Sequence, residues 1–369
     1  MRVLMTGGGT AGHINPAIAI ANTIKKNIPN ADIAFVGTKR GLENKLVVNE
    51  GYHLYHVDIM GISRSLSLKN IKALALMITS QIQAKKIIEE FKPDIVIGTG
   101  GYVCWPALKV AAKMGIPTAV HESNARPGLA IRQLQGSLDR IFVNFKDTEN
   151  YITNKNAVMH VGNPLRSGFG GLDYEEARRT LGIGDDKTYV LSFGGSLGAQ
   201  RINEISFDFM NTRAKGNASI IYHHATGDRD WAEFSEKFRK AGLDDYTNLS
   251  MVEYIHDMAL RMSAADIVIC RAGAMTISEL AMMRKACIMI PSPNVVDNHQ
   301  YKNAKVLSDA DAVVMLEEKD LDEEKFVSTL LDLIKNKEKR DTLSENIARF
   351  ANTDANKLIF DEIMRLTNK

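Results

Sequence analysis

Two glycine-rich segments carry the residues of this sequence that could take part in chemistry. One spans Gly7–Gly12 and is followed at once by His13, and the other covers residues 194–198 with a central serine. Glycines let the backbone approach a ligand closely, and the N–H groups of a following helix favour a phosphate or another polar oxygen. Because each segment follows an apolar run, we expect two strand-to-helix turns that grip one ligand between them.

The first turn fits neither of two common nucleotide-binding motifs. It satisfies GxGxxG, but the next apolar run ends with VGTK at residues 36–39 and lacks the acid that would hold the ribose of a dinucleotide. A P-loop would need Lys followed by Ser or Thr where His13 and Ile14 stand. The sequence therefore disfavours both a nicotinamide oxidoreductase and a P-loop enzyme.

Pairs of metal-ligand residue types occur without the context of a metal site. Of three DxD pairs, only the first follows a predicted strand, at some distance, and the others fall at a helix end and a helix start, where acids are ordinary. His223 and His224 are adjacent and have no partner at metal-ligand spacing. We predict no essential metal ion and no other cofactor. The three pairs are Asp228 with Asp230, Asp309 with Asp311, and Asp320 with Asp322.

Apolar runs that alternate with helical patterns must position these turns. Such runs indicate parallel sheets covered on both faces, and we predict an α/β fold with two Rossmann-like, doubly wound domains. The Gly and Pro of GNP at residues 162–164 indicate the linker between the domains. The runs are residues 33–36, 94–97, 118–120 and 140–143 in the first half, and 189–193, 219–222, 266–270 and 287–290 in the second.

The composition is that of a globular protein of more than one domain. The 369 residues are 45% hydrophobic and 24% charged. Three widely spaced cysteines suggest neither a disulfide framework nor a zinc site, which favours a reducing compartment. We expect no signal peptide and no transmembrane segment, because glycines interrupt the first apolar run and no run reaches about 18 apolar residues.

Seven motifs together give the sequence a specific resemblance. They occur in order over nearly the full chain, and the chain resembles the bacterial N-acetylglucosaminyltransferases of peptidoglycan synthesis, the MurG family, which convert lipid I to lipid II. The motifs are GGGTAGHINPA (7–17), GTGGYV (98–103), HESN (121–124), GNPLR (162–166), GGSLGAQRIN (194–203), RAGAMTISE (271–279) and DNHQ (297–300).

The resemblance implies a glycosyltransferase-B fold, in which two Rossmann-like domains face each other across a cleft. It further implies that a C-terminal helix, for which residues 352–366 are the candidate, crosses back to the first domain. The expected domains are therefore residues 1–162 plus 350–369, which bind acceptor and membrane, and residues 163–349, which bind the donor UDP-GlcNAc. The family also implies an inverting transfer of GlcNAc to the muramoyl 4-hydroxyl of lipid I.

The resemblance assigns most of the donor site to the second domain. Glu279 is implied to accept hydrogen bonds from the ribose hydroxyls, although a plain helix acid remains the alternative. The backbone of Ile255 is implied to read the uracil edge, with Tyr254 beside the ring or simply packed in place. The remaining implied contacts are Ser196, Ala274, Met275 and Thr276 at the diphosphate, Ile277 and Ser278 as further substrate-binding residues, Arg166 at the ring, and His299 and Gln300 at sugar hydroxyls.

The first domain is implied to hold the catalytic groups. His13 is the first candidate for the base that deprotonates the acceptor, because a helix N-terminus disfavours its imidazolium form; the alternative is that it only orients the loop. Glu122 is the second candidate, with a loop-stabilising acceptor as its alternative. Asn124 is implied to reach the cleft, and the first turn contributes contacts through Thr10, Ala11 and Gly12.

Charge and amphipathic pattern point to a membrane surface. Residues 1–162 hold 19 Lys and Arg against 11 Asp and Glu, a net charge of +8, whereas the remainder holds 27 against 33, a net charge of −6. The basic amphipathic segment 59–92 suits an anionic membrane or a helix packed on the sheet, and its loop 63–68 is the favoured contact. We expect UDP-GlcNAc, lipid I and an anionic membrane as partners, no nucleic acid, and a peripheral place on the cytoplasmic face. The alternative function is a UDP-GlcNAc epimerase of the same architecture.

Overall fold

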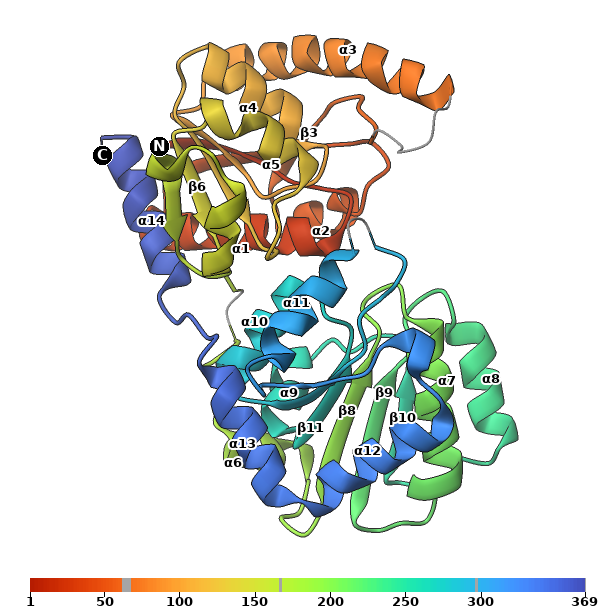
Figure 1. The fold of residues 1–369 in the computed structure, drawn as a ribbon. Helices are drawn as coiled ribbons and strands as arrows, with labels where there is room; N and C mark the ends of the chain where they lie inside the picture. The colour runs from red at the N-terminus through yellow and green to blue at the C-terminus, as the bar shows by residue number, and fades with distance from the viewer. Residues whose placement is uncertain (62–67, 166–167, 296–297, 369) are drawn as a thin grey trace. The chain divides into compact units, whose positions relative to one another are not determined.

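The computed structural model describes residues 1–61, 68–165, 168–295 and 298–368. The chain divides into two compact units (Figure 1), one comprising Met1–Ser167 with Asn352–Lys369 and the other Gly168–Ala351. The first crossing between units thus falls after Ser167, a few residues beyond the predicted boundary at Gly162. Each unit contains one sheet and is described by itself below.

The first unit contains a seven-stranded parallel sheet in the order β3-β2-β1-β4-β5-β6-β7. The chain starts in the middle, moves outward to β3, and then returns to the other side of β1, so the sheet is doubly wound. Neighbouring strands β1 and β4 carry the reversal of direction. The strands are β1 (Arg2–Thr6), β2 (Asp32–Gly37), β3 (His53–His56), β4 (Ile95–Gly98), β5 (Thr118–Glu122), β6 (Arg140–Val143) and β7 (Val158–His160).

Alternate residues of these strands enter two separate cores. Leu4 packs with residues of α3, α4 and α5 on one face, while Val3 and Met5 pack with α1 and α14 on the other. Successive strand side chains point to opposite faces, so a run apolar at every position requires cover on both. The helices are α1 (Ala11–Asn27), α2 (Glu43–Asn49), α3 (Leu68–Phe91), α4 (Cys104–Lys113), α5 (Leu129–Leu134) and α14 (Ala355–Leu366), with 3-10 turns at Gln135–Ser137, Lys146–Tyr151 and Lys155–Ala157.

The C-terminal helix α14 belongs to the first unit. Its Ile359 and Ile363 are buried in the same core as α1. On the same helix, the buried Glu362 carboxylate accepts a hydrogen bond from Arg140 Nε at 2.6 Å. A carboxylate between arginines resists protonation, and the hydrogen bond and charge of Arg365, with those of Arg140, lower the pKa of Glu362.

The second unit repeats the plan with a six-stranded parallel sheet in the order β10-β9-β8-β11-β12-β13. Here β8 and β11 are the neighbours at which the winding reverses. The strands are β8 (Thr188–Phe193), β9 (Ile220–Ala225), β10 (Leu249–Val252), β11 (Ile267–Cys270), β12 (Ala286–Met289) and β13 (Val314–Met315). The helices are α6 (Tyr174–Leu181), α7 (Gln200–Phe209), α8 (Trp231–Lys240), α9 (Met258–Ala264), α10 (Ala274–Met283), α11 (His299–Ser308), α12 (Glu323–Lys335) and α13 (Lys337–Ala348), with a π turn at Met210–Ala214 and a 3-10 turn at Glu318–Asp320.

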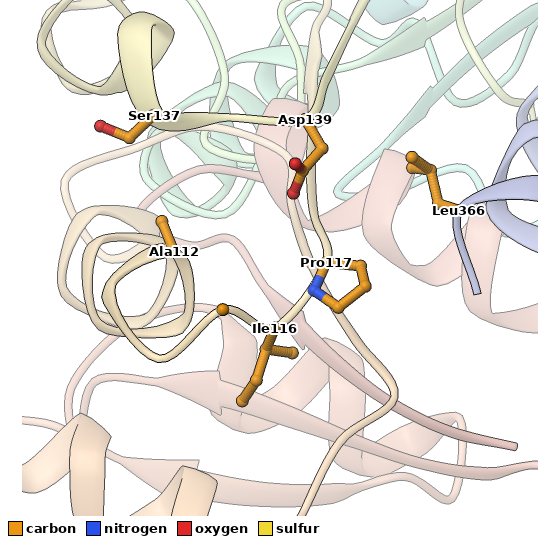
Figure 2. Close-up of a pocket in the computed structure, with 7 residues that line it drawn as sticks. Ala112, Ile116, Pro117, Ser137, Asp139 and Leu366 are labelled. Atoms are coloured by element: carbon orange, nitrogen blue, oxygen red, sulfur yellow. The ribbon is translucent and has the colours of Figure 1, made fainter.

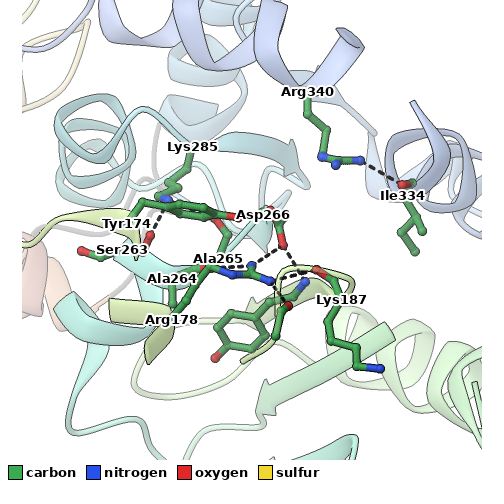
Figure 3. A network of polar contacts seen from close by, with 12 residues as sticks. Tyr174, Arg178, Lys187, Ser263, Ala264, Ala265, Asp266, Lys285, Ile334 and Arg340 are labelled. Carbon is green, nitrogen blue, oxygen red and sulfur yellow. Dashed lines mark hydrogen bonds and ion pairs between the residues drawn. The ribbon is translucent and has the colours of Figure 1, made fainter. Parts of the chain in front are cut away.

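A polar network fastens α6 to the amino-terminal end of this second sheet (Figure 3). The carboxylate of Asp266 accepts hydrogen bonds from Tyr174 Oη at 2.7 Å, Arg178 Nη1 at 2.9 Å and the Tyr189 backbone N at 2.7 Å. The buried ammonium of Lys285 donates to the Ser263 carbonyl at 2.6 Å and lies 4.9 Å from the centre of the Tyr174 ring. Every buried charge of this network therefore has polar or aromatic partners, as burial requires.

The prediction of an α/β fold with two doubly wound parallel sheets is confirmed. In open sheets of this kind, ligands bind outside the carboxyl ends of the strands, where the winding reverses. That rule selects the turns after β1 and β4 in the first unit and after β8 and β11 in the second.

Candidate functional site

The turn after β1 brings His13 against the turn after β4. The ring Nδ1 of His13 lies 3.2 Å from the Thr99 carbonyl oxygen, and the Thr99 hydroxyl donates to the His13 carbonyl at 2.6 Å. Because a carbonyl oxygen can only accept, Nδ1 carries the proton and the lone pair of the neutral ring is on Nε2. The two predicted segments 7–17 and 98–103 thus form one half-site.

Glycines after β4 leave room for the histidine ring. A Cβ at Gly100 would lie 2.6 Å from Nδ1 of His13, and one at Gly101 would lie 2.6 Å from the Gly8 carbonyl oxygen. Both glycines have positive φ, 103° and 77°, which L side chains rarely adopt. Only glycine therefore satisfies both the backbone and the ring at these positions.

The contacts of the first turn differ between its residues. Thr10 and Gly12 are exposed and Ala11 is half-buried, and the Thr10 carbonyl accepts the first hydrogen bonds of α1 from the N–H groups of His13 and Ile14. These residues lie at the sheet edge where a ligand is expected, and their predicted contacts stay predictions.

Sequence analysis missed one residue of this half-site, Glu43. Its carboxyl group is buried below the first turn and accepts a hydrogen bond from the Gly9 N–H at 3.2 Å. Tyr102, which is 40% exposed, lies close enough that burial and the Glu43 charge both raise its tyrosyl pKa. The dinucleotide motif places its acid at the end of the second strand, whereas Glu43 comes six residues after the end of β2, at the start of α2, so that pattern does not include it.

Glu122 ends β5 and is buried beneath the loop that follows it. Its Oε1 accepts from the backbone N and side-chain Nδ2 of Asn124 at 2.9 and 3.0 Å, and its Oε2 accepts from the Gly128 N at 2.8 Å. Burial raises the pKa of Glu122, and these hydrogen bonds oppose the rise. The contacts match the loop-stabilising alternative. They also orient the half-buried Asn124 at the carboxyl end of the sheet.

In the second unit, the turn after β8 is held against the turn after β9. A Cβ at Gly198 would lie 2.1 Å from the Thr226 carbonyl oxygen, and one at Gly227 would lie 2.1 Å from the Gly198 N. This close approach leaves the side chain of Ser196 exposed, and the Ser196 carbonyl accepts from the Asp228 N at 3.3 Å. Ser196 is thus on the face of the turn that a ligand can reach.

The turn after β11 leads directly into α10. Gly273 is the N-cap, so the cap residue itself places no side chain at the start of the helix. Four of its predicted residues are buried, while Thr276 and Glu279 are half-buried. Arg271 ties this turn to neighbouring segments, because its guanidinium donates to the Ile290 carbonyl at 3.1 Å and pairs with Glu318. The four buried residues are Ala274, Met275, Ile277 and Ser278.

The other predicted donor contacts are distributed over nearby loops of the second unit. Ile255 is buried, whereas Tyr254 is 50% exposed with its ring centre 5.0 Å from that of His256. Half-buried His299 and Gln300 begin α11, and Gln300 Oε1 accepts from the Ser292 N at 2.9 Å. Arg166 lies outside the described residues.

Both halves of the chain match models of one glycosyltransferase family. The N-terminal domain of glycosyltransferase family 28 matches residues 3–143, and its C-terminal domain matches residues 189–359. A protein of Acetivibrio thermocellus named UDP-N-acetylglucosamine--N-acetylmuramyl-(pentapeptide) pyrophosphoryl-undecaprenol N-acetylglucosamine transferase is 41% identical over 98% of this chain and 97% of its own length. One of the same name from Ruminiclostridium cellulolyticum is 42% identical over 99% of this chain and all of its own. The chain belongs to this transferase family, the MurG family.

Solved structures agree with membership of the MurG family. Acinetobacter baumannii MurG superposes with a TM-score of 0.75 at 27% identity, over 99% of both chains. A Neisseria meningitidis UDP-GlcNAc 2-epimerase bound to UDP-GlcNAc has a TM-score of 0.67 at only 15% identity, over 99% of this chain and all of its own. At that identity the likeness shows the two-domain glycosyltransferase-B fold alone.

Two of the candidate metal ligands in this MurG family member have structural partners. His224 lies between Ser192 Oγ at 2.6 Å and Asn203 Oδ1 at 3.1 Å, and burial lowers its pKa to about 3. Asp322 caps α12 by accepting from the Lys325 N at 2.7 Å. Among the described residues, no three His, Cys, Asp or Glu side chains gather as a metal site would require.

A surface pocket lies at the amino ends of the strands of the first sheet, opposite the proposed ligand end (Figure 2). It adjoins the amino ends of β5 and β6, and the Asp139 carboxylate in it already accepts from the Thr118 N at 2.8 Å and Oγ1 at 2.9 Å. The carboxyl-edge rule for ligands therefore excludes this pocket from the MurG half-sites. Its lining residues are Ala112, Gly115, Ile116, Pro117, Ser137, Asp139 and Leu366.

The predicted membrane segment is partly described. Residues 62–67, which include most of the predicted contact loop, lie outside the described residues. On α3, Ile78 and Ile82 are 65% and 55% exposed, and Lys85 and Lys86 follow them on the helix surface. Over the described parts of the chain, no helix combines the length and apolarity that crossing a bilayer demands.

Proposed function

We propose that this chain is an inverting transferase that moves GlcNAc from UDP-GlcNAc to the muramoyl 4-hydroxyl of lipid I, giving lipid II and UDP. The observation that carries the proposal is the full-length identity of about 41% with transferases of that name, which spans both glycine turns. The fold alone would suit an epimerase equally well, but the epimerase likeness stops at 15% identity.

The donor half of the reaction belongs to the second unit. Glu279 binds the ribose hydroxyls, because an ionised carboxylate offers two oxygens to two donors. The start of α10 and the turn around Ser196 bind the diphosphate through backbone N–H groups, for which a helix N-terminus is suited. Ile255, Tyr254 and Arg166 bind the uracil, and His299 and Gln300 bind the sugar. These assignments rest on motif position and, except for Arg166, which lies outside the described residues, on a common place at the carboxyl ends of the strands of the second sheet.

His13 is the base that deprotonates the acceptor hydroxyl. The Thr99 carbonyl holds the proton on Nδ1, which leaves the basic lone pair on Nε2. A helix N-terminus favours the neutral ring that a base needs. One direct displacement of the diphosphate by the deprotonated hydroxyl then inverts the anomeric centre. Glu122, which we proposed from sequence as the second base candidate, acts instead by holding the loop that carries Asn124.

The acceptor half and the membrane contact belong to the first unit. Its residues 1–162 carry a net charge of +8, which favours an anionic lipid surface. Exposed Ile78 and Ile82 on α3, next to two lysines, supply an apolar and a basic contact. The enzyme therefore works as a peripheral protein at the cytoplasmic face, where lipid I and an anionic membrane are its partners.

The role of His13 can be tested separately from donor binding. His13→Ala should lower turnover with UDP-GlcNAc and a short-chain lipid I analogue by about 100-fold or more, since a positioned base contributes about that much. Affinity for UDP, measured by calorimetry, should stay unchanged. His160→Ala, which removes an exposed histidine of the same unit, is the matched control and should keep full turnover. A fully active His13→Ala enzyme would contradict the assignment.

A further inference from the structure

Glu43 is a buried acid with no role in the donor or acceptor contacts described above. It is the first residue of α2 and has 0% of its surface exposed. A buried carboxylate is costly unless its oxygens receive hydrogen bonds, so its partners indicate what it does.

The two carboxylate oxygens of Glu43 accept hydrogen bonds from two different segments of the chain. Oε1 accepts from the backbone N and the hydroxyl of Thr38, both at 2.8 Å, in the turn after β2. Oε2 accepts from the N–H of Gly9, in the catalytic turn after β1, at 3.2 Å. One carboxyl group therefore ties the catalytic turn to the neighbouring turn of the sheet.

Three glycines form the space that this carboxyl group fills. A Cβ at Gly8 would lie 2.9 Å from Glu43 Cδ, one at Gly37 would lie 2.6 Å from Cγ, and one at Gly41 would lie 2.1 Å from Oε2. The glycines come from both turns and from the approach to α2. Even a methyl group on any of them would displace the Glu43 side chain, so the three glycines are needed for the acid to occupy this position.

Gly9, which donates to Glu43, lies one residue before the N-cap of the helix that carries His13. Gly9 has a φ of 85°, and the next residue, Thr10, accepts from the His13 N at 3.1 Å. On its other side the histidine contacts Thr99 and Gly100. The imidazole ring thus has a direct contact with Thr99, while Glu43 acts on it indirectly by holding the turn that leads into the helix of His13.

We propose that Glu43 is a positioning residue for the transfer reaction, which holds the catalytic turn and thereby aims His13 without touching substrate. This inference rests on the proposed function, because it concerns the base of that reaction. All residues in this proposal belong to the first unit, so donor binding by the second unit should not depend on Glu43.

Two substitutions each remove one hydrogen bond from the same carboxyl group. In Glu43→Gln, the side-chain oxygen keeps the two Thr38 donors, and the amide NH₂ then faces the Gly9 N–H, so that bond is lost. In Thr38→Val, the hydroxyl bond is lost and the Gly9 bond remains. The turn before α2 stays fastened in both, because Asn44 Nδ2 donates to the Thr38 carbonyl at 2.7 Å and the Gly41 carbonyl at 2.9 Å.

The experiment compares both variants with wild type in turnover, UDP affinity and amide hydrogen exchange of residues 7–12. Glu43→Gln should speed exchange of the Gly9 amide and lower kcat, each by about ten-fold or more, as expected for losing a hydrogen bond to a charged group. UDP affinity should match wild type. Thr38→Val should leave kcat and Gly9 exchange unchanged.

Several results would overturn the inference. These are wild-type turnover in Glu43→Gln, equal losses in both variants, or a loss of UDP affinity that parallels the loss of kcat. If wild type itself failed to transfer sugar, the proposed function would fall. The exchange comparison would still decide whether Glu43 holds the turn.

Discussion

At the residue scale, the first half-site depends on what glycine permits around His13. Gly100 has a φ of 103°, and the imidazole ring of His13 occupies the space that a side chain at position 100 would fill. The position and tautomer of His13, the proposed base, are thereby set by the backbone of Thr99 and Gly100. Such preorganisation removes the need to arrange the base during reaction.

Gly100→Ala should therefore act on turnover more than on folding. The new methyl group would lie 2.6 Å from Nδ1 and push the ring aside, and a displacement of about 1 Å can cost about 100-fold in rate. Gly115→Ala is the matched control, because Gly115 also has positive φ, 70°, yet no atom lies within 4 Å of its Cβ position. Both should lose about 1 kcal/mol of stability in denaturant unfolding. Equal turnover in the two variants would refute the steric account.

The sequence could suggest His13 but not Glu43. His13 follows a recognisable glycine turn, whereas an acid in the first turn of a short helix ordinarily faces solvent. What makes Glu43 buried is its contact with Gly9, 34 positions earlier, and with three glycines that come together only in the fold. Contacts between residues so far apart in the sequence leave no local sequence pattern from which they could be predicted.

At the element scale, the sequence predicted the inner strands and missed the edges. The four strands with no predicted counterpart are β3, β7, β10 and β13, which end the two sheets. Inner strands are buried on both faces and read as apolar runs, while β3 is the half-exposed HLYH and β7 is VMH. Edge strands lack the apolar signal because solvent covers part of them.

The network that fastens α6 predicts a pH dependence of stability. Burial, reinforced by Arg178 against the opposing charge of Asp266, lowers the pKa of Lys285 to about 8 from 10.5. Between these values the unfolded chain holds a proton that the folded chain has released, so stability rises with pH. The rise is bounded at about 1.4 kcal/mol per pH unit. Above pH 10 it is opposed by Tyr174, whose pKa burial and Asp266 raise.

Urea unfolding between pH 7.5 and 9.5 measures this dependence. Lys285→Met should flatten the rise, whereas Lys337→Met, which removes an exposed lysine on α13, should keep it. A rise of the same slope in Lys285→Met would show that other groups cause it.

Helix α14 is expected to stabilise the first unit although it lies at the far end of the chain. Ile363 is fully buried in the core with α1, so Ile363→Ala should cost about 2 to 5 kcal/mol. Lys357→Ala on the exposed side is the control. The chain has two tryptophans, Trp105 in the first unit and Trp231 in the second, so a Trp231→Phe background makes fluorescence report on the first unit. An unchanged unfolding midpoint would exclude this role.

At the scale of the whole molecule, two similar sheets carry different chemistry. Each has its glycine turns at the place where the winding reverses, and each was foreseeable from a strand, turn and helix pattern. What the sequence could not supply is which atoms meet there, since Thr99 with His13, and Gly198 with Thr226, are distant in sequence. In the proposed function the base lies in one unit and the donor contacts lie in the other, and a transferase needs both substrates for turnover.

The most direct test of that claim is the release of UDP from UDP-GlcNAc by purified enzyme, measured with and without a short-chain lipid I analogue. We predict release only when the analogue is present, in step with formation of the β-linked disaccharide product. Release of UDP or appearance of an epimerised sugar in the absence of acceptor would contradict the assignment as a transferase.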